Sequence, residues 1–103
     1  MKKIKMGMIG GGTGAFIGDA HRRAARICND YDLVGGVFSS NPERNRESAA
    51  REGIAPDRCY DSVDAMIAGE LAKPEDERIR LVSIVTPNSL HFSQAKAFLS
   101  NGF

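Results

Sequence analysis

The sequence predicts an α/β fold, a doubly wound parallel sheet with helices on both of its faces. Three observations lead to this prediction. Short apolar runs alternate along the chain with segments of helical periodicity, an order typical of parallel strands joined by crossover helices. A glycine-rich turn, residues 10–18, directly follows the first apolar run. The chain has 103 residues, a length that suits one domain.

The first expected strand, residues 4–9, stops at three glycines, and an amphipathic helix of about three turns follows the glycine-rich turn. Asn29 and Asp30 end this helix. Spacings of four and three residues predict a buried face made of Ala20, Ala24 and Ile27. The opposite, solvent-facing side is expected to carry Arg22, Arg23 and Arg26.

A second strand is expected over residues 33–38, buried on both faces. The paired glycines Gly35 and Gly36 indicate a bulge in this strand or a close approach of two backbones. The helix that follows has clear start and stop signals. Asn41 suits the N-cap, and Gly53 suits a left-handed end.

The second half of the chain is expected to hold two more strands and two more helices. A minimal strand at residues 59–60 precedes a helix capped by Asp61 or Ser62. Residues 79–86 are almost continuously apolar and predict a strand covered on both faces. On the last helix, an apolar face is shared by Phe92, Ala95 and Leu99.

Composition and charge exclude several classes of protein. The 14 basic and 13 acidic side chains give a net charge of +1, whereas a dedicated nucleic-acid binder is normally strongly basic. No apolar stretch approaches the roughly 18 residues that span a bilayer. The two cysteines are too few for a disulfide scaffold or a metal-ligand cluster. We expect a cytoplasmic protein with no metal site and no nucleic-acid or membrane partner.

The glycine-rich turn lies between a strand and a helix, where a Rossmann-like, dinucleotide-binding fold needs glycines. Gly10 suits the sharp turn, and Gly12 lets backbone N–H groups approach a pyrophosphate near the helix N-terminus. The third small residue is either Ala15 or Gly18, and the sequence does not separate these registers. No Gly-Lys-Ser/Thr follows, which excludes a P-loop. The residues of this turn expected to bind the cofactor are Gly10, Gly12, Thr13, Gly14, Ala15, Phe16 and Ile17.

The tip of the second strand bears on the choice between NAD and NADP. In NAD sites an acidic residue at this tip binds the ribose hydroxyls, but here Ser39 and Ser40 follow the strand. Both serines can donate hydrogen bonds to a 2′-phosphate, and Arg44 can supply the charge. We therefore expect these three residues to bind the cofactor, and NADP to be tolerated or preferred. The alternative is that the serines cap a turn and Arg44 is a solvated helix charge.

Three further motifs occur in order along the chain: GDAHRRA at residues 18–24, NPER at 41–44 and TPNSLH at 86–91. They resemble the G-x-x-H-x-x-A, D-P-E-R and T-P-N-x-x-H motifs of the glucose–fructose oxidoreductase and inositol dehydrogenase family, called Gfo/Idh/MocA. The resemblance covers essentially the whole chain, and the third motif is the most specific. Ser39 stands where many members of the family carry Asp, which leaves the choice between NAD and NADP open.

The resemblance implies an NAD(P)-dependent oxidoreductase that acts on a ring hydroxyl of a sugar, sugar nucleotide or cyclitol. It also implies that the nicotinamide side of the cofactor is lined by Thr86, Pro87, Asn88 and His91. The expected partners are NAD or NADP, a small sugar or cyclitol substrate of the full-length protein, and further copies of the chain in a homo-oligomer.

Members of the family continue into a fifth strand that ends in Glu-Lys-Pro, whose lysine assists hydride transfer, and then into a substrate domain. This chain stops at Phe103, so we assign no catalytic residue. We expect residues 1–103 to be an incomplete N-terminal dinucleotide-binding domain, truncated before its fifth strand, that binds cofactor without catalysis of its own. Without that strand, residues 81–85 form an apolar sheet edge through which the chain is expected to self-associate.

Two alternative functions are compatible with the same residues. A stand-alone dinucleotide-binding or regulatory module would bind the cofactor without turnover. A methyltransferase-like fold would also use a glycine-rich turn, but it needs an acid at the tip of the second strand, where Ser39 stands.

Overall fold

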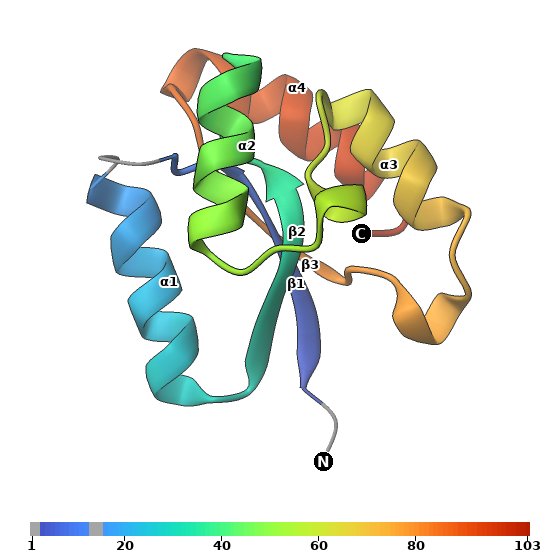
Figure 1. The fold of residues 1–103 in the computed structure, drawn as a ribbon. Helices are drawn as coiled ribbons and strands as arrows, with labels where there is room; N and C mark the ends of the chain where they lie inside the picture. The colour runs from blue at the N-terminus through green and yellow to red at the C-terminus, as the bar shows by residue number, and fades with distance from the viewer. Residues whose placement is uncertain (1–2, 13–15) are drawn as a thin grey trace.

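The computed structural model describes residues 3–12 and 16–103. They form a parallel sheet with strands in the order β2-β1-β3 (Figure 1), whose bounds are β1 (Ile4–Gly10), β2 (Tyr31–Val37) and β3 (Leu81–Val85). The helices that connect and flank them are α1 (Phe16–Cys28), α2 (Pro42–Arg51), α3 (Val63–Leu71) and α4 (Asn88–Leu99). None of these described helices combines the length and the apolar character that crossing a membrane requires.

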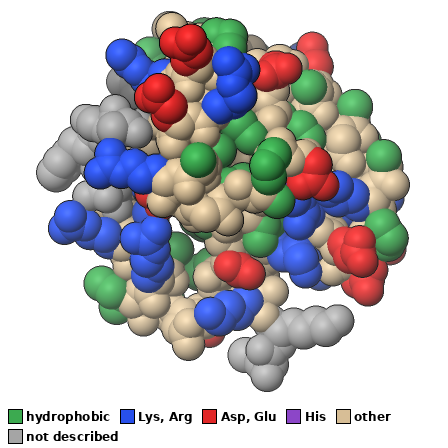
Figure 2. Space-filling view, in the orientation of Figure 1, with side chains coloured by type: hydrophobic (Ala, Val, Ile, Leu, Met, Phe, Trp, Pro, Cys, Tyr) green, Lys and Arg blue, Asp and Glu red, His purple; other side chains and the backbone are tan. Residues whose placement is uncertain are grey.

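Helices cover both faces of the sheet, which confirms the doubly wound α/β fold (Figure 1). Two apolar clusters mark the two interfaces. The cluster on the side of α1 and α2 is built on Met6, Met8, Phe38, Ala49 and Ile54. The cluster on the side of α3 and α4 is built on Ile9, Val37, Tyr60, Met66, Ile67, Ile79 and Phe98. Acidic and basic side chains are interspersed over the face of the molecule seen in Figure 2.

The paired glycines of β2 mark both a bulge and a close backbone approach, as expected. The register between β1 and β2 shifts by one residue between Met6 and Gly7, so that Gly35 lies beside Gly7. A Cβ atom on Gly36 would collide with the main chain of Met8. These glycines therefore let β2 pack directly against the central strand.

The start and stop signals around α2 are confirmed. Asn41 is the N-cap, and its side-chain oxygen accepts a hydrogen bond from the backbone N of Arg44 at 3.0 Å. Gly53 follows the helix with a φ of +73°, in the left-handed region that favours glycine. The next helix, α3, is capped by Ser62, one of the two expected residues, which accepts from the backbone N of Ala65 at 3.0 Å.

The expected minimal strand after α2 is a single bridge beside β2. Cys59 pairs with Gly36, and the backbone N of Tyr60 donates to the carbonyl of Gly36 at 2.9 Å. Asn45, which is buried, fixes this segment. Its side chain accepts from the backbone N of Phe38 and donates to the carbonyl of Tyr60, each at 2.7 Å. One amide thus ties the tip of β2 to the crossover segment.

A buried carboxylate joins α3 to the segments on both sides of it. Glu70 is completely buried, and its Oε1 accepts hydrogen bonds at 2.9 Å from both Arg58 Nη2 and the backbone N of Ile79. Its Oε2 accepts from Arg58 Nε at 3.3 Å and from the hydroxyl of Tyr60. Burial and the hydrogen bond to Glu70 raise the pKa of Tyr60, so its hydroxyl stays a donor at neutral pH.

The expectation for the buried face of α1 is wrong. The residues expected inside are all exposed, namely Ala20, Ala24 and Ile27. Ile27 is 85% exposed, whereas Arg22, expected outside, is 7% exposed. The inner stripe of α1 contains Gly18 and Arg22, which are buried, and Ala25, which is partly buried, because the helix turns its smallest residue toward the glycine-rich turn for close packing.

The expectation for the apolar face of α4 is also wrong. Phe92 and Leu99 are 79% and 72% exposed, and Phe98 is the residue that reaches the core, with 3% exposed. Phe103 turns back after the helix and packs edge-to-face on Phe98, with ring centroids 5.4 Å apart. Two apolar stripes run along α4, and packing against Phe103 and α3 decides which one is buried.

The last strand, β3, forms an edge of the sheet and is only half-buried. The expectation that this strand is covered on both faces is therefore wrong. In the described part of the chain it pairs with β1 alone. An apolar groove of about 460 Å³ lies on one side, between α1 and β3, and a second of about 320 Å³ lies on the other, between β3 and α4. Leu81, at the start of the strand, is 41% exposed.

We expect the 103-residue chain to self-associate through β3, because an apolar edge strand offers a second chain a row of backbone N–H and C=O groups. The variant Leu81→Lys should lower the average mass in light scattering by placing a charge on this edge. Leu71→Lys is the matched control, since Leu71 is 38% exposed on α3, away from the edge. A monodisperse wild-type monomer, or an equal effect of both variants, would contradict this expectation.

Candidate functional site

A cleft of about 550 Å³ lies at the carboxyl ends of all three strands. The chain leaves β1 toward β2 on one side and returns to β3 on the other, so the cleft is at the topological switch point where open α/β sheets bind ligands. The residues that line it are Ile9, Gly10, Gly11, Gly12, Val37, Phe38, Ser39, Ser40, Arg44, Asp61, Ser62, Val63, Val85, Thr86, Pro87, Leu90 and Gln94.

The described glycines of the turn fill the narrow space between the tips of β2 and β3. Gly10 and Gly11 have φ values of +85° and +72°, a conformation that other residues rarely adopt. A Cβ atom on Gly10 would lie 3.1 Å from Thr86 Cγ2, and one on Gly12 would lie 2.9 Å from the carbonyl oxygen of Phe38. Backbone alone fits here, which is the property that lets a pyrophosphate approach main-chain N–H groups.

The structure places Gly18 in the role of the third small residue of the turn. A Cβ atom on Gly18 would collide with the Cα atom of Gly11, so glycine at this position sets how closely α1 approaches the turn. The competing candidate, Ala15, lies outside the described residues, as do Thr13 and Gly14. Because α1 begins at Phe16, its N-terminal turn directly follows the glycines.

Most of the expected site residues that the structure describes converge on this cleft. Those that line it are Gly10, Gly12, Ser39, Ser40, Arg44, Thr86 and Pro87. Phe16 and Ile17 open α1, and Asn88 opens α4, each at the helix end nearest the strand tips. His91, on the first turns of α4, is not among the lining residues.

At the tip of β2 the serines have two candidate roles, binding of the cofactor and capping of a turn, and the structure supports part of each. Ser39 Oγ accepts a hydrogen bond from the backbone N of Asn41 at 3.1 Å, so this serine does cap a turn. Its hydroxyl hydrogen is still available for donation, and Ser40 and the exposed Arg44 line the same cleft. The cleft also contains an acid, Asp61, which reaches it from the segment before α3 and does not belong to the tip of β2.

At the tip of β3, His91 acts on the turn and not on the cleft. Its Nε2 donates to the carbonyl oxygen of Thr86 at 2.7 Å, which ties α4 to the end of the strand. Thr86 Oγ1 donates to Gln94 Oε1 at 2.6 Å, and both residues line the cleft. Gln94 therefore sets the direction of the threonine hydroxyl.

Several lining residues were missed by reasoning from the sequence. Leu90 and Gln94 are four residues apart on α4, so the helical period alone would have placed them on one face of that helix. That face starts next to the Thr86-Pro87 turn. Gly11 stands within the glycine string itself. No local signal marks Asp61 or Val63, because only the crossover between the sheet faces brings them to the cleft.

Comparison with known proteins identifies the family. The model of the Gfo/Idh/MocA oxidoreductase family, NAD-binding Rossmann fold, matches residues 4–103. The chain belongs to this family. The turn of glycines without room for a Cβ atom fits the NAD-binding role of this domain.

Individual relatives of this Gfo/Idh/MocA chain are 36–42% identical to it in sequence. YfiI, an uncharacterized oxidoreductase of Bacillus subtilis strain 168, is 36% identical over 102 residues, which are 98% of this chain and 25% of that protein. An oxidoreductase from Sinorhizobium meliloti is 42% identical with a TM-score of 0.90, over 100% of this chain and 28% of that one. An inositol dehydrogenase homolog from Azotobacter vinelandii, complexed with NADH and myo-inositol, is 36% identical with a TM-score of 0.93. The match covers 99% of this chain and 26% of that one. The chain thus spans about a quarter of the length of these relatives.

Proposed function

We propose that these 103 residues form the N-terminal, cofactor-binding part of a longer NAD(P)-dependent oxidoreductase. The enzyme would transfer a hydride between the nicotinamide ring and a ring hydroxyl of a sugar, sugar nucleotide or cyclitol. The observation that carries the proposal is the glycine-lined cleft at the switch point of the sheet. The inositol dehydrogenase homolog, whose structure contains NADH and myo-inositol, supports the cofactor and substrate classes.

Each strand tip has its own part in this proposal. The turn after β1 presents backbone N–H groups to the pyrophosphate, together with the N-terminus of α1. Ser39, Ser40 and Arg44 hold the adenosine ribose and, in NADP, its 2′-phosphate. Thr86 and Pro87 flank the nicotinamide half, with the threonine fixed by Gln94 and His91. The bound nicotinamide supplies or accepts the hydride.

The chain is proposed to bind its cofactor without turnover by itself. Hydride transfer to or from a hydroxyl needs a group that moves the hydroxyl proton and a site that holds the substrate. We assign neither to these residues, and the relatives are about four times as long. The alternative is a stand-alone dinucleotide-binding module, which would bind cofactor equally well. It differs in that extending the chain to the length of its relatives would produce no dehydrogenase activity.

Titration with NADH and NADPH, followed by nicotinamide fluorescence, tests the proposal and the choice of cofactor. We expect saturable binding of both, because Ser39 leaves the β2 tip without the acid that repels a 2′-phosphate. Ser39→Asp should weaken NADPH binding at least about tenfold relative to NADH, since it places a charge beside the phosphate. Ser100→Asp, with the same charge at the far end of α4, is the control. Binding of neither cofactor contradicts the function, and much tighter NADH binding by the wild type contradicts the NADPH expectation.

A further inference from the structure

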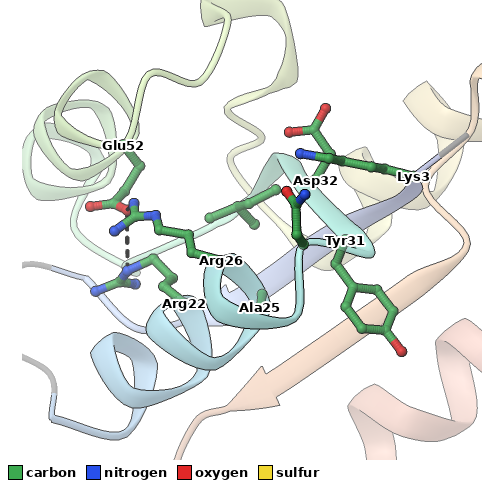
Figure 3. Close-up of a pocket in the computed structure, with 9 residues that line it drawn as sticks. Lys3, Arg22, Ala25, Arg26, Tyr31, Asp32 and Glu52 are labelled. Atoms are coloured by element: carbon green, nitrogen blue, oxygen red, sulfur yellow. Dashed lines mark hydrogen bonds and ion pairs between the residues drawn. The ribbon is translucent and has the colours of Figure 1, made fainter.

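A buried arginine lies directly beneath the glycine-rich turn. Arg22 is only 7% exposed, and its Nη1 donates to the carbonyl oxygen of Gly11 at 2.6 Å. Its Nε lies 3.3 Å from Glu52 Oε1, at the end of α2. Figure 3 shows Arg22 and Arg26 reaching from α1 toward this one carboxylate, which Arg26 Nη2 contacts at 2.8 Å.

Arg22 reaches the turn from outside the cofactor cleft. It does not line the cleft, but it does line a separate polar pocket of about 380 Å³ between α1 and the N-terminal end of β2 (Figure 3). Burying a guanidinium is unfavourable unless its hydrogen bonds and its charge are matched. Here the carbonyl of Gly11 accepts a hydrogen bond from the guanidinium and the carboxylate of Glu52 balances its charge, so the fold keeps a charged donor pointed at the main chain of the turn.

The contact with Gly11 fixes the orientation of the peptide group between Gly11 and Gly12. In a trans peptide the C=O and the following N–H point in opposite directions, and the described chain contains no cis peptide bond. Because the carbonyl of Gly11 points to Arg22, the N–H of Gly12 points away from Arg22. A peptide between two glycines has no Cβ atom to resist rotation, so this orientation needs an external hold.

We propose that Arg22 is a positioning residue for the dinucleotide: by holding the carbonyl of Gly11, it keeps the N–H of Gly12 turned toward the pyrophosphate. Glu52 fixes the guanidinium and balances much of its charge, so Arg22 acts through the turn and does not itself bind the phosphate. The inference rests on the proposed function, because it assumes that the cleft binds a dinucleotide. It adds to that function a binding determinant outside the cleft.

Arg26 provides a matched control for this role. It lies one turn further along α1, contacts the same carboxylate of Glu52, and is 66% exposed, with no hydrogen bond to the glycine-rich turn among the described contacts. Arg22→Met and Arg26→Met therefore both remove an ion pair with Glu52, but only the first releases the carbonyl of Gly11.

The test compares NADH with adenosine, which lacks the pyrophosphate, as probes of wild-type, Arg22→Met and Arg26→Met chains. Arg22→Met should raise the Kd for NADH about tenfold or more, the loss expected for one hydrogen bond from the N–H of Gly12 to a charged acceptor, the pyrophosphate. Its Kd for adenosine should stay within about twofold of the wild type, and Arg26→Met should change neither value. If the role of Arg22 were merely structural, Arg22→Met would weaken the binding of NADH and of adenosine alike.

Circular dichroism confirms that each variant is folded before it is titrated. If Arg22→Met does not fold, Arg22→Lys replaces it, since lysine keeps the buried charge but loses the planar fork that spans Gly11 and Glu52. The same selective loss of NADH affinity is expected for that variant. Unchanged NADH affinity in a folded Arg22 variant would overturn this inference and leave the proposed function intact. Absence of NADH binding by the wild type would overturn both.

Discussion

Replacing Glu70 with alanine is expected to lower the free energy of unfolding by about 3–5 kcal/mol, the range measured when one partner of a buried ion pair is removed. The carboxylate is completely buried and accepts hydrogen bonds from Arg58, Tyr60 and the backbone N of Ile79. Alanine would leave the Tyr60 hydroxyl and the backbone N of Ile79 without this acceptor, would leave the charge of Arg58 with only the carbonyl of Glu77 among its described acceptors, and would open a cavity beside α3. A domain of this size has only about 5–15 kcal/mol of total stability, so the variant should be close to unfolding.

Thermal unfolding followed by circular dichroism measures this loss. Tm should fall by at least about 12 °C, taking about 4 °C per kcal/mol for a small domain. Glu75→Gln is the control, because it removes an exposed carboxylate from the acidic segment after α3. A Tm for Glu70→Ala within about 3 °C of the wild type would show that the buried network contributes little to the fold.

The same carboxylate predicts an acid-dependent loss of stability. Burial by itself would raise the pKa of Glu70, but hydrogen bonds from Arg58, Tyr60 and Ile79 and the charge of Arg58 outweigh it and hold the pKa below the usual value. In the unfolded chain the pKa returns to that usual value. The stabilisation is therefore complete above the usual pKa and is lost as the pH falls through the folded-state pKa. Unfolding free energy should fall more steeply with acid in the wild type than in Glu70→Gln.

Replacing Gly18 with alanine is expected to weaken NADH binding at least about tenfold and to destabilise the chain by about 1–3 kcal/mol, the range typical of overpacking. The added Cβ atom would collide with the Cα atom of Gly11. The backbone of α1 fixes the position of this Cβ atom and the Gly11 Cα is main chain, so neither can move aside without shifting the helix or the turn. A shifted turn carries its N–H groups away from the pyrophosphate. Glycine to alanine within a helix otherwise stabilises by about 0.5–1 kcal/mol, so a net loss must come from this collision.

Urea denaturation and NADH titration of the same samples measure the two effects of this change. Ala20→Ser is the control, since it adds one atom to an exposed position of α1 two residues further along. If Gly18→Ala raised the stability and bound NADH as tightly as the wild type, the close approach of α1 to the turn would not matter for either property.

Local signals in the sequence placed the elements and most of the candidate site. A cap acts within about one helical turn, so Asn41 and Gly53 were recognisable without any knowledge of the fold. The glycine turn and the Thr86-Pro87 turn follow apolar strands directly. Because parallel strands end at one edge of a sheet, these turns were bound to meet there.

The rotation of each helix about its axis could not be read from the sequence. On α1 the alanine and isoleucine stripe looked apolar, yet Arg22 is buried and Ile27 is exposed. The small size of Gly18 and the need of the Gly11 carbonyl for a donor decided that rotation. The positions of Asp61 and Gln94 in the cleft could not be predicted for a related reason, since they depend on how α3 and α4 pack.

The sequence by itself determined the order of strands and helices, the helix caps, the glycine-rich turn and, through its motifs, the family. These features depend on interactions between residues a few positions apart, so they are present whatever the rest of the fold does. Only the tertiary structure decided which helix faces are buried, that Glu70 and Arg22 are internal ions, and which side chains complete the cleft. Those outcomes depend on distant segments, because a polar group is buried only where the rest of the fold supplies its partners.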